Sequence, residues 1–259
     1  MKITRIRLDN KGWFTMLTLE NISLKLGEGQ EKNEILQNIS LNFDSGKLYV
    51  ITGPNGGGKT SIAKLIMGIY QPSRGKILLD RAEITDLSIT ERGRLGIRYA
   101  FQNPPRFKGV EIERLLKLSN PNVGINDLRS IMVRIGLCPE DYLGRMADNS
   151  LSGGEMKRLE VATVLLSQTK VAILDEPEAG VDLWGFEQLL DLVISSHRQA
   201  KGRTSIIISH SEKFLEAADE IIVVADGAIQ ERGKMEAIRP LINEGIQCQW
   251  RKMCPKGGR

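Results

Sequence analysis

A glycine-rich run that directly follows a short apolar segment constrains the fold of this 259-residue chain more than any other feature. The apolar segment is Leu48-Tyr-Val-Ile51, and the glycine-rich run is Gly53-Pro-Asn-Gly-Gly-Gly-Lys59-Thr60. Its spacing is that of a loop that wraps backbone amides around phosphate groups. Such a loop stands between a strand and a helix, so we expect a strand before Gly53 and a helix from Thr60 to Met67.

The residue types of this loop suit a nucleotide triphosphate. Glycines let the backbone approach phosphates in conformations that a Cβ would forbid. Lys59 supplies a positive charge to the β- and γ-phosphates, and the Thr60 hydroxyl is a ligand for Mg²⁺. An ordinary glycine-rich turn is the alternative, and the preceding strand disfavours it. The nucleotide-binding residues predicted here are Gly53, Pro54, Asn55, Gly56, Gly57, Gly58, Lys59, Thr60 and Ser61.

Two carboxylates follow a second apolar run downstream. Val171-Ala-Ile-Leu174 is typical of a buried parallel strand, and Asp175-Glu176-Pro177 comes directly after it. Ligands of α/β sheets lie at the carboxyl ends of the strands. We therefore expect Asp175 to bind Mg²⁺ and Glu176 to accept a proton from the attacking water. A solvated acidic loop is the alternative if Asp175-Glu176-Pro177 is considered alone.

A second candidate anion site is the run Leu151-Ser-Gly-Gly-Glu155. Ser152 has the character of a helix N-cap, and the residues from Glu155 to Leu166 have helical apolar spacing. A capped helix start presents free N–H groups to an anion, so Ser152, Gly153 and Gly154 are predicted to contact phosphate. A capped helix without a ligand is the alternative.

Taken together, these motifs resemble the ATP-binding-cassette (ABC) ATPases from Leu17 to about Gly233. The order of motifs is that of the family: the phosphate-binding loop, Gln102 in Ala100-Phe-Gln-Asn-Pro104, the signature Leu151 to Glu155, Asp175-Glu176, Ala179-Gly-Val-Asp182, and His210 in Ile206-Ile-Ile-Ser-His210. The resemblance implies that the signature of one protomer closes over ATP held by another, in an ATP-dependent homodimer. It also implies that Gln102 completes the Mg²⁺ and water shell, that His210 contacts the γ-phosphate, and that Asp182 lies in the nucleotide-binding interface.

The resemblance implies an α/β fold: a RecA-like P-loop NTPase core with an N-terminal antiparallel β-subdomain and a helical signature subdomain. Alternating residues from Met16 to Phe43 agree with antiparallel strands joined by a polar turn at 27–33. We expect an N-terminal extension at 1–15, one ABC ATPase domain at 16–240 with the helical subdomain inserted at about 103–165, and a basic tail at 241–259. The insert is predicted to be mobile.

The residues found within two of these motifs are similar to those of SufC, the ATPase of the SUF iron–sulfur cluster assembly system. They are Gly153-Gly-Glu155-Met-Lys157-Arg158 and Ala100-Phe-Gln-Asn-Pro104 followed by Gly109-Val110. The resemblance implies scaffold partners like SufB and SufD. No aromatic residue lies between Leu19 and Ser40 to stack on adenine, so we expect Ile35 or Leu36 to pack against the base.

Two other functions stay open. Pro177 and the short helical insert are typical of a transporter cassette whose membrane domains lie on a separate chain. A cassette without turnover, acting as an ATP-gated clamp, is the third hypothesis. The loop from Asn103 to Val110, with Phe107 as an apolar knob, is a candidate docking surface for a partner, or else a packed connector.

Composition excludes other classes of protein. No apolar run reaches 18 residues, so we expect no direct membrane insertion. Charges interrupt the first residues where a signal peptide would be apolar, and a cytoplasmic location is expected. The chain has a net charge of +4, and its last 15 residues contain four basic residues and no acid, so the rest of the chain is neutral overall and nucleic acid is not an expected partner. Cys138, Cys248 and Cys254 match no metal-site spacing and are expected to be reduced; the role of the last two stays open.

Overall fold

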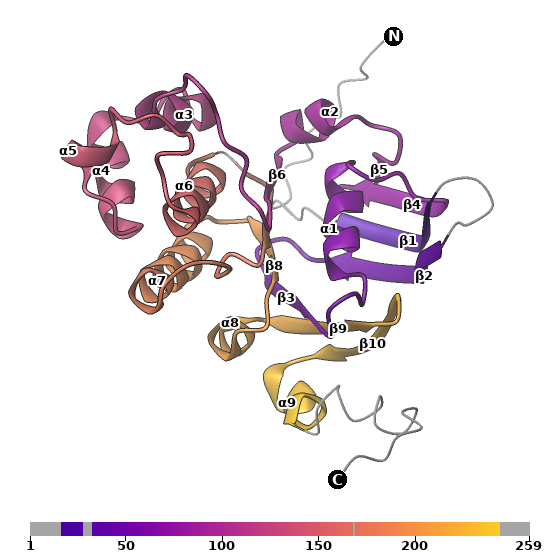
Figure 1. Cartoon of the computed structure of the whole chain (residues 1–259). Coiled ribbons are helices and arrows are strands. Elements are labelled where there is room, and N and C mark those ends of the chain that lie inside the picture. Colours follow the sequence, from indigo (N-terminus) through magenta and orange to yellow (C-terminus); the bar gives the residue numbers. More distant parts are fainter. Residues whose placement is uncertain (1–16, 28–32, 168, 244–259) are drawn as a thin grey trace.

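The computed structural model describes residues 17–27, 33–167 and 169–243. Two β-sheets and a lobe of helices make up this part of the chain (Figure 1). The extension at 1–15, the polar turn at 28–32 and the tail from 244, with Cys248 and Cys254, lie outside the described residues.

The six-stranded sheet has the order β10-β9-β3-β8-β7-β6. Every strand pairing in it is parallel except that of β10 with β9. Strands β3, β7 and β8 are buried along their whole length, which explains their continuous apolar sequences. Its strands are β3 (Leu48–Thr52), β6 (Ile97–Ala100), β7 (Val171–Asp175), β8 (Thr204–Ile208), β9 (Glu220–Ala225) and β10 (Ala228–Gly233).

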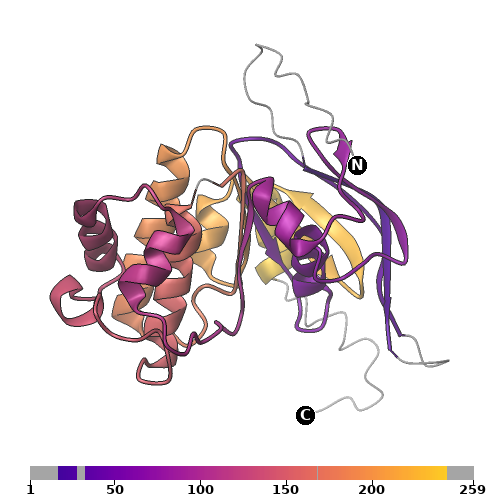
Figure 2. The same ribbon diagram turned by 90° about the horizontal axis from the view of Figure 1, so that it is seen from above.

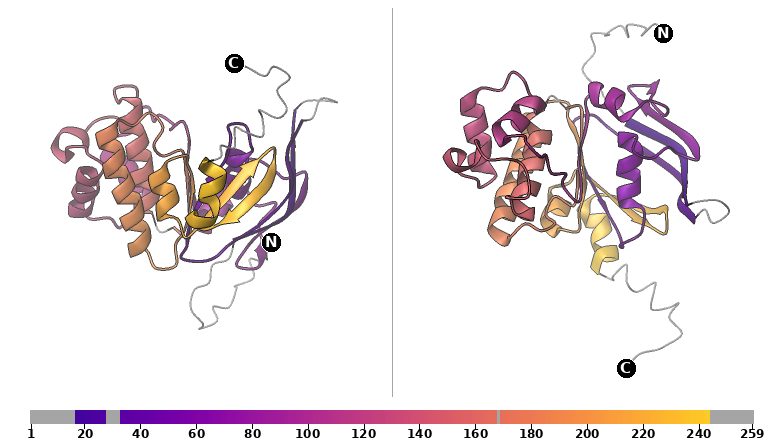
Figure 3. Two further views of the ribbon diagram at one scale, coloured as in Figure 1. Left: turned by 90° about the horizontal axis from the view of Figure 1, so that it is seen from below. Right: turned by 45° about the horizontal axis from the view of Figure 1, so that its top comes forward.

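The antiparallel sheet has the order β2-β1-β4-β5, with strands β1 (Leu17–Leu26), β2 (Asn33–Phe43), β4 (Arg74–Leu79) and β5 (Ala82–Glu83). Helix α1 (Lys59–Met67) lies between the two sheets, as the right view of Figure 3 shows. Its apolar residues, including Ile62 and Ile66, share one buried cluster with Leu19 of the antiparallel sheet and Ile51 of the parallel one. The phosphate-binding loop is therefore held between two layers of strands.

A helical lobe covers the other side of the six-stranded sheet (Figure 2). The predicted helical segment from Glu111 to Ile135 is two helices, separated at 120–124 where Asn120, Pro121 and Gly124 interrupt the pattern. Helix α6 packs against α3, α4, α7, β6 and β7 and so connects the lobe to the sheet. The lobe consists of α3 (Ile112–Ser119), α4 (Ile125–Arg134), α5 (Pro139–Tyr142), α6 (Gly153–Leu166) and α7 (Leu183–Gln199).

Three further helices complete the described chain: α2 (Ile89–Arg94), α8 (Glu212–Ala217) and α9 (Met235–Asn243). Among the described residues no helix combines the length and the apolar character that crossing a membrane requires.

Parallel pairing brings the predicted site residues to one edge of the sheet. Asp175 at the end of β7 lies opposite Ile208 of β8, and Ala100 of β6 lies opposite Leu174. Ile51 of β3 lies opposite Ile208 from the other side. The loops that begin at Gly53, Phe101, Glu176 and Ser209 consequently leave the sheet side by side.

Candidate functional site

Close packing against β9 requires two of the glycines of the phosphate-binding loop, Gly53 and Gly57. Gly53 has φ +136°, and a Cβ there would lie 2.0 Å from the Val224 carbonyl oxygen. Gly57 is also confined, though less tightly, since its Cβ would meet the same oxygen at 2.8 Å. Gly56, with φ +78°, faces open space. Gly53 and Gly57 therefore permit a backbone approach that no other residue allows, whereas Gly56 supplies only a left-handed turn.

Lys59 is buried and turns back over its own loop. Its Nζ donates to the carbonyl oxygens of Gly53 at 2.7 Å and Pro54 at 2.9 Å. Burial lowers the pKa of Lys59, and the charges of Glu176 and Asp175 oppose that shift. The ammonium group is thus held by weak neutral acceptors at the mouth of the loop, where phosphate oxygens are stronger acceptors.

Thr60 and Asp175 meet where the sequence predicts a metal ion. The Thr60 hydroxyl donates to Asp175 Oδ1 at 3.2 Å, and the Tyr99 hydroxyl donates to Asp175 Oδ2 at 2.6 Å. Burial raises the pKa of Asp175, and both hydrogen bonds act against that rise. Sequence reasoning missed Tyr99, although its position at the penultimate residue of β6, beside β7, was a usable signal.

The donor set fits Mg²⁺ bound with a nucleotide. A hydroxyl and a carboxylate are hard oxygen ligands, and Mg²⁺ in such sites keeps one or two protein oxygens besides phosphates and water. Within the described part of the chain no group of three or more His, Cys, Asp and Glu side chains could hold a metal ion without such help. Gln102, the third predicted ligand, makes no hydrogen bond to Asp175 among the described residues; its Nε2 donates to Glu176 Oε2 at 2.8 Å.

Glu176 and His210 follow neighbouring strands. Glu176 has the left-handed φ of 45°, and its N–H donates to the Ile208 carbonyl oxygen at 2.9 Å, which directs the residue out of the sheet. Partial burial lowers the pKa of His210, as does the charge of Lys59, while Glu176 acts in the opposite direction. The imidazole is accordingly neutral at pH 7 and retains one ring nitrogen as an acceptor.

The signature run begins α6 with a capping box. Ser152 Oγ accepts from the Glu155 N–H at 3.2 Å, and Glu155 Oε2 accepts from the Ser152 N–H at 2.7 Å. Gly154 lies against the loop that precedes α7, where a Cβ would come within 2.8 Å of the Gly180 carbonyl oxygen. Asp182 ends that loop as the N-cap of α7, accepting from the Gly185 N–H at 2.9 Å.

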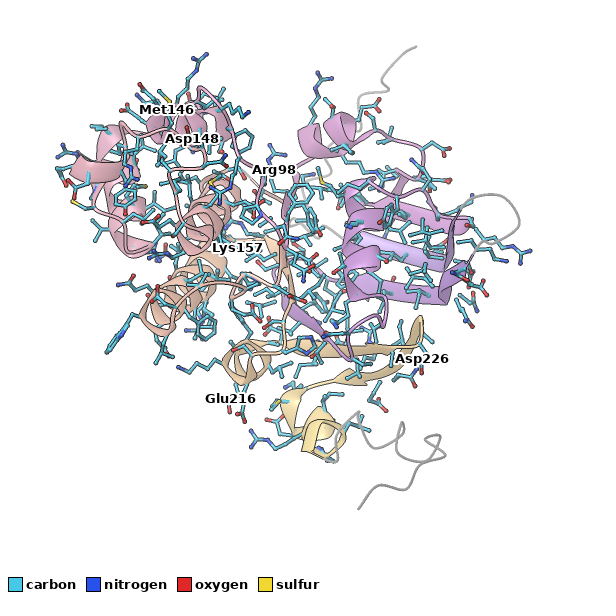
Figure 4. The ribbon with its side chains drawn as sticks, viewed as in Figure 1. Arg98, Met146, Asp148, Lys157, Glu216 and Asp226 are labelled. Carbon is cyan, nitrogen blue, oxygen red and sulfur yellow. The ribbon has the colours of Figure 1, made fainter. Side chains whose placement is uncertain are left out.

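Lys157 and Glu160 of α6 hold the segment that carries Gln102, and sequence reasoning gave neither a role. Lys157 is fully buried, and its Nζ donates to the carbonyl oxygens of Phe101, Gln102 at 3.3 Å and Asp175 at 2.8 Å. Glu160 Oε1 accepts from the Phe101 N–H at 3.0 Å. Figure 4 labels Lys157 at the junction of the helical lobe and the sheets. The signature helix and the Gln102 segment are therefore one connected unit.

Two expectations change with the structure. Leu36 is fully buried in the core between the sheets, so of the two residues predicted to pack against a base only Ile35 keeps an exposed part.

The loop around Phe107 behaves as a connector, because the Phe107 N–H donates to the Ala147 carbonyl oxygen at 2.7 Å and the Ala147 N–H donates to the Val110 carbonyl oxygen at 2.8 Å. The Phe107 side chain nevertheless remains 36% exposed.

Comparison with known proteins gives one consistent answer. A family model described as ABC transporter matches residues 36–179. An uncharacterised ABC transporter ATP-binding protein of Methanocaldococcus jannaschii is 33% identical over 84% of this chain and 88% of its own. A probable ATP-dependent transporter of Cyanidium caldarium is 31% identical over 90% of this chain and 96% of its own. The fold is similar to that of one subunit in a solved structure of a dimeric ATP-binding cassette bound to ADP and Pi, with a TM-score of 0.74, 22% identity, and coverage of 85% of this chain and 98% of that one. The predicted α/β P-loop fold class is thereby confirmed.

Proposed function

The chain is an ATPase of the ABC transporter family, and we propose that it is the ATP-hydrolysing subunit of an ABC transporter whose membrane domains lie on a separate chain. The observation that carries the proposal is the convergence of Lys59, Thr60, Asp175 and Glu176 at one edge of the sheet. The transporter names of the relatives favour this reading over the other two. The chain would work on the cytoplasmic side, where ATP is supplied.

Each site residue has a definite task in this proposal. Lys59 exchanges its two loop carbonyls for β- and γ-phosphate oxygens, and the free amides of the loop and of the α1 N-terminus bind the rest of the phosphate chain. Thr60 and Asp175 would hold Mg²⁺, which supplies charge neutralisation when bound. Glu176 would accept a proton from water that Gln102 orients, and the neutral His210 ring would face the γ-phosphate. Ser152 and Gly153 of a second copy complete the site.

Replacing the general base tests the proposal. Glu176→Gln removes the proton acceptor but retains an oxygen for Gln102, so we expect turnover to fall by roughly 10²-fold while ATP binding persists. The control Glu216→Gln removes an exposed carboxylate on α8 that pairs with Arg239 and leaves turnover unchanged. Steady-state phosphate release and ATP titration measure both quantities. Equal phosphate release from Glu176→Gln and wild type would exclude Glu176 as the base, and no release from wild type would favour the ATP-gated clamp.

A SufC-like motor acting on SufB/SufD-like scaffold proteins is a second candidate. It rests on the resemblance of the run Gly153-Gly-Glu155-Met-Lys157-Arg158, whose lysine contacts the carbonyl oxygens of Gln102 and Asp175. In this candidate the same ATP cycle moves a scaffold instead of membrane domains.

The identity of the bound chain separates these two candidates. Affinity purification of the full chain from its native cell, with mass spectrometry of the co-purifying protein, yields a membrane permease under the first and a soluble scaffold under the second. The genes next to this one provide an independent test, since permease genes there favour the first candidate and scaffold genes favour the second. Phe107→Ala tests whether the half-exposed Phe107 ring contributes to that contact, and Leu118→Ala, at an exposed residue of α3, is the control.

A further inference from the structure

Among the described residues, a single backbone hydrogen bond joins the turn after β7 to the end of β8, and the turn after β8 is joined by its backbone to β3 instead. The Glu176 N–H donates to Ile208, and the Ser209 N–H donates to the Ile51 carbonyl oxygen of β3 at 3.2 Å. Beyond Glu176 no further backbone hydrogen bond joins the two turns among the described residues. Any further hydrogen bond between the two turns therefore has to come from side chains.

Glu178 and Ser209 supply that contact. The Ser209 hydroxyl, which is completely buried, donates to Glu178 Oε1. The same hydroxyl oxygen accepts from the Ser211 N–H at 2.9 Å, so it also closes the turn on either side of His210. Ser209 thus connects its own turn to the turn after β7 through a single carboxylate.

Stability alone gives no reason for a carboxylate at this position. Burial raises the pKa of Glu178, and Ser209 and the His210 backbone amide oppose the rise. Its second oxygen, Oε2, is buried without a hydrogen-bond partner among the described residues. A neutral acceptor would avoid this desolvation cost, and a buried polar group that breaks local rules in this way typically serves a site.

His210 depends on this turn for its placement. Its ring makes no hydrogen bond to another described side chain, so its direction follows from the backbone of Ser209 to Ser211. The charges that act on the ring, those of Lys59 and Glu176, are groups of the phosphate site itself.

We propose that Glu178 is a positioning residue for ATP hydrolysis: its carboxylate, acting through the Ser209 hydroxyl, fixes the turn that carries His210 relative to Glu176. This inference rests on the proposed function, because the geometry matters only if His210 faces a γ-phosphate. No covalent step is assigned to Glu178, which does not touch the reacting atoms.

A double-mutant cycle tests the inference. Glu178→Ala removes the acceptor for Ser209, and we expect kcat to fall about 10-fold with the ATP dissociation constant unchanged, since displacement of an aligned group by about 1 Å costs up to 10²-fold. In a His210→Ala background the same substitution should lower kcat no further, because the group that it positions is gone. Glu178→Gln keeps an oxygen for the Ser209 hydroxyl and should restore kcat to within about 3-fold of wild type.

Control variants keep the outcomes separable. Glu187→Ala removes a solvent-facing carboxylate on α7 that pairs with Lys213 and should change nothing. Should Glu178→Ala fail to fold, Ser209→Ala removes the same hydrogen bond from the other side, with the same expectations. The inference is overturned if Glu178→Ala leaves kcat unchanged, or if it lowers kcat in the His210→Ala background by the same factor as in wild type. Either result leaves the proposed function intact. An absence of ATP hydrolysis by wild type overturns both.

Discussion

Burial of ionisable side chains beside the phosphate site is the dominant feature at the scale of single residues. Lys157, Glu160 and Asp175 are each at most 7% exposed, and burial shifts each pKa toward the neutral form. Lys157 satisfies its three donors with carbonyl oxygens, whereas Glu160 leaves Oε2 unpaired among the described residues. Glu160 is therefore the member of this group whose charge the folded chain tolerates least.

Stability should depend on pH through Glu160. Burial raises the pKa of Glu160 from 4.5 to about 7, against the Phe101 N–H and Lys157. The folded chain thus binds this proton more tightly than the unfolded chain, so the stabilisation is complete below pH 4.5 and is lost as the pH rises through about 7. Glu160→Gln keeps the hydrogen bond with Phe101 and removes the charge. As the pH rises from 4.5 to 8, the free energy of unfolding of the variant should therefore increase by about 3 kcal/mol relative to that of wild type. Urea unfolding at both values measures the gain, and an equal difference at the two would contradict the assignment.

At the scale of elements, the phosphate-binding loop depends on β9 as well as on its own strand and helix. Val224 of β9 presents its carbonyl oxygen to both Gly53 and Gly57. The turn after β9 adds a hydrogen bond of 3.1 Å from the Gly227 N–H to Gly57, and the Gln37 N–H of β2 donates to Gly227 at 2.8 Å. The loop is consequently clamped between two sheets before any ligand binds, which lowers the entropic cost of ordering it around phosphates.

Two alanine substitutions separate close approach from simple turn geometry. Gly53→Ala places a Cβ against Val224 and should lower the free energy of unfolding by about 3 kcal/mol or more, with loss of ATP binding. Gly56→Ala has a left-handed φ but open space around it, and should cost only about 1 kcal/mol. Chemical unfolding and nucleotide titration of both variants provide the comparison. Similar losses in the two would mean that contact with β9 is unimportant.

At the scale of the whole molecule, the signature of one copy is expected to act on ATP held by another. No hydrogen bond joins Ser152, Gly153 or Gly154 to the phosphate-binding loop of the same chain within the described residues. The start of α6 belongs to the helical lobe, and α1 lies between the two sheets (Figure 1). A single chain therefore presents the two predicted phosphate-binding elements separately, which suits a pair of composite sites in a homodimer.

A substitution at the signature tests this arrangement. In a Glu176→Gln background, Ser152→Arg should leave one ATP bound per chain but abolish ATP-dependent dimerisation, because the bulky cation blocks the helix start. Ser88→Arg is a closely matched control, since Ser88 caps α2 with the same capping box and its loss also costs about 1 kcal/mol. Light scattering with and without ATP measures the dimer. Dimerisation of Ser152→Arg at the level of the control would place the second phosphate contact elsewhere.

Local sequence determined the elements that carry the chemistry. The run from Gly53 to Thr60 predicted a strand, a loop and a helix, and α1 begins at Lys59, one residue earlier than expected. The N-cap at Ser152 and the acidic residues after Val171-Ala-Ile-Leu174 were readable because caps, turns and buried parallel strands depend on residues close together in the chain. The roles assigned to these residues, like the division into domains, remain predictions that the experiments above address.

Tertiary structure alone decided which distant residues meet. Three contacts join residues that lie more than 30 positions apart in the sequence, so no local pattern marks them as partners. They are the contacts of Tyr99 with Asp175, Lys157 with Phe101, and Glu178 with Ser209. Leu36 and Ile35 have similar side chains, and only the pleat of β2 turns the first into the core and leaves the second half-exposed. Packing of sheets and helices against one another selects these contacts, because burial and hydrogen bonding reward neighbours in space irrespective of their separation in sequence.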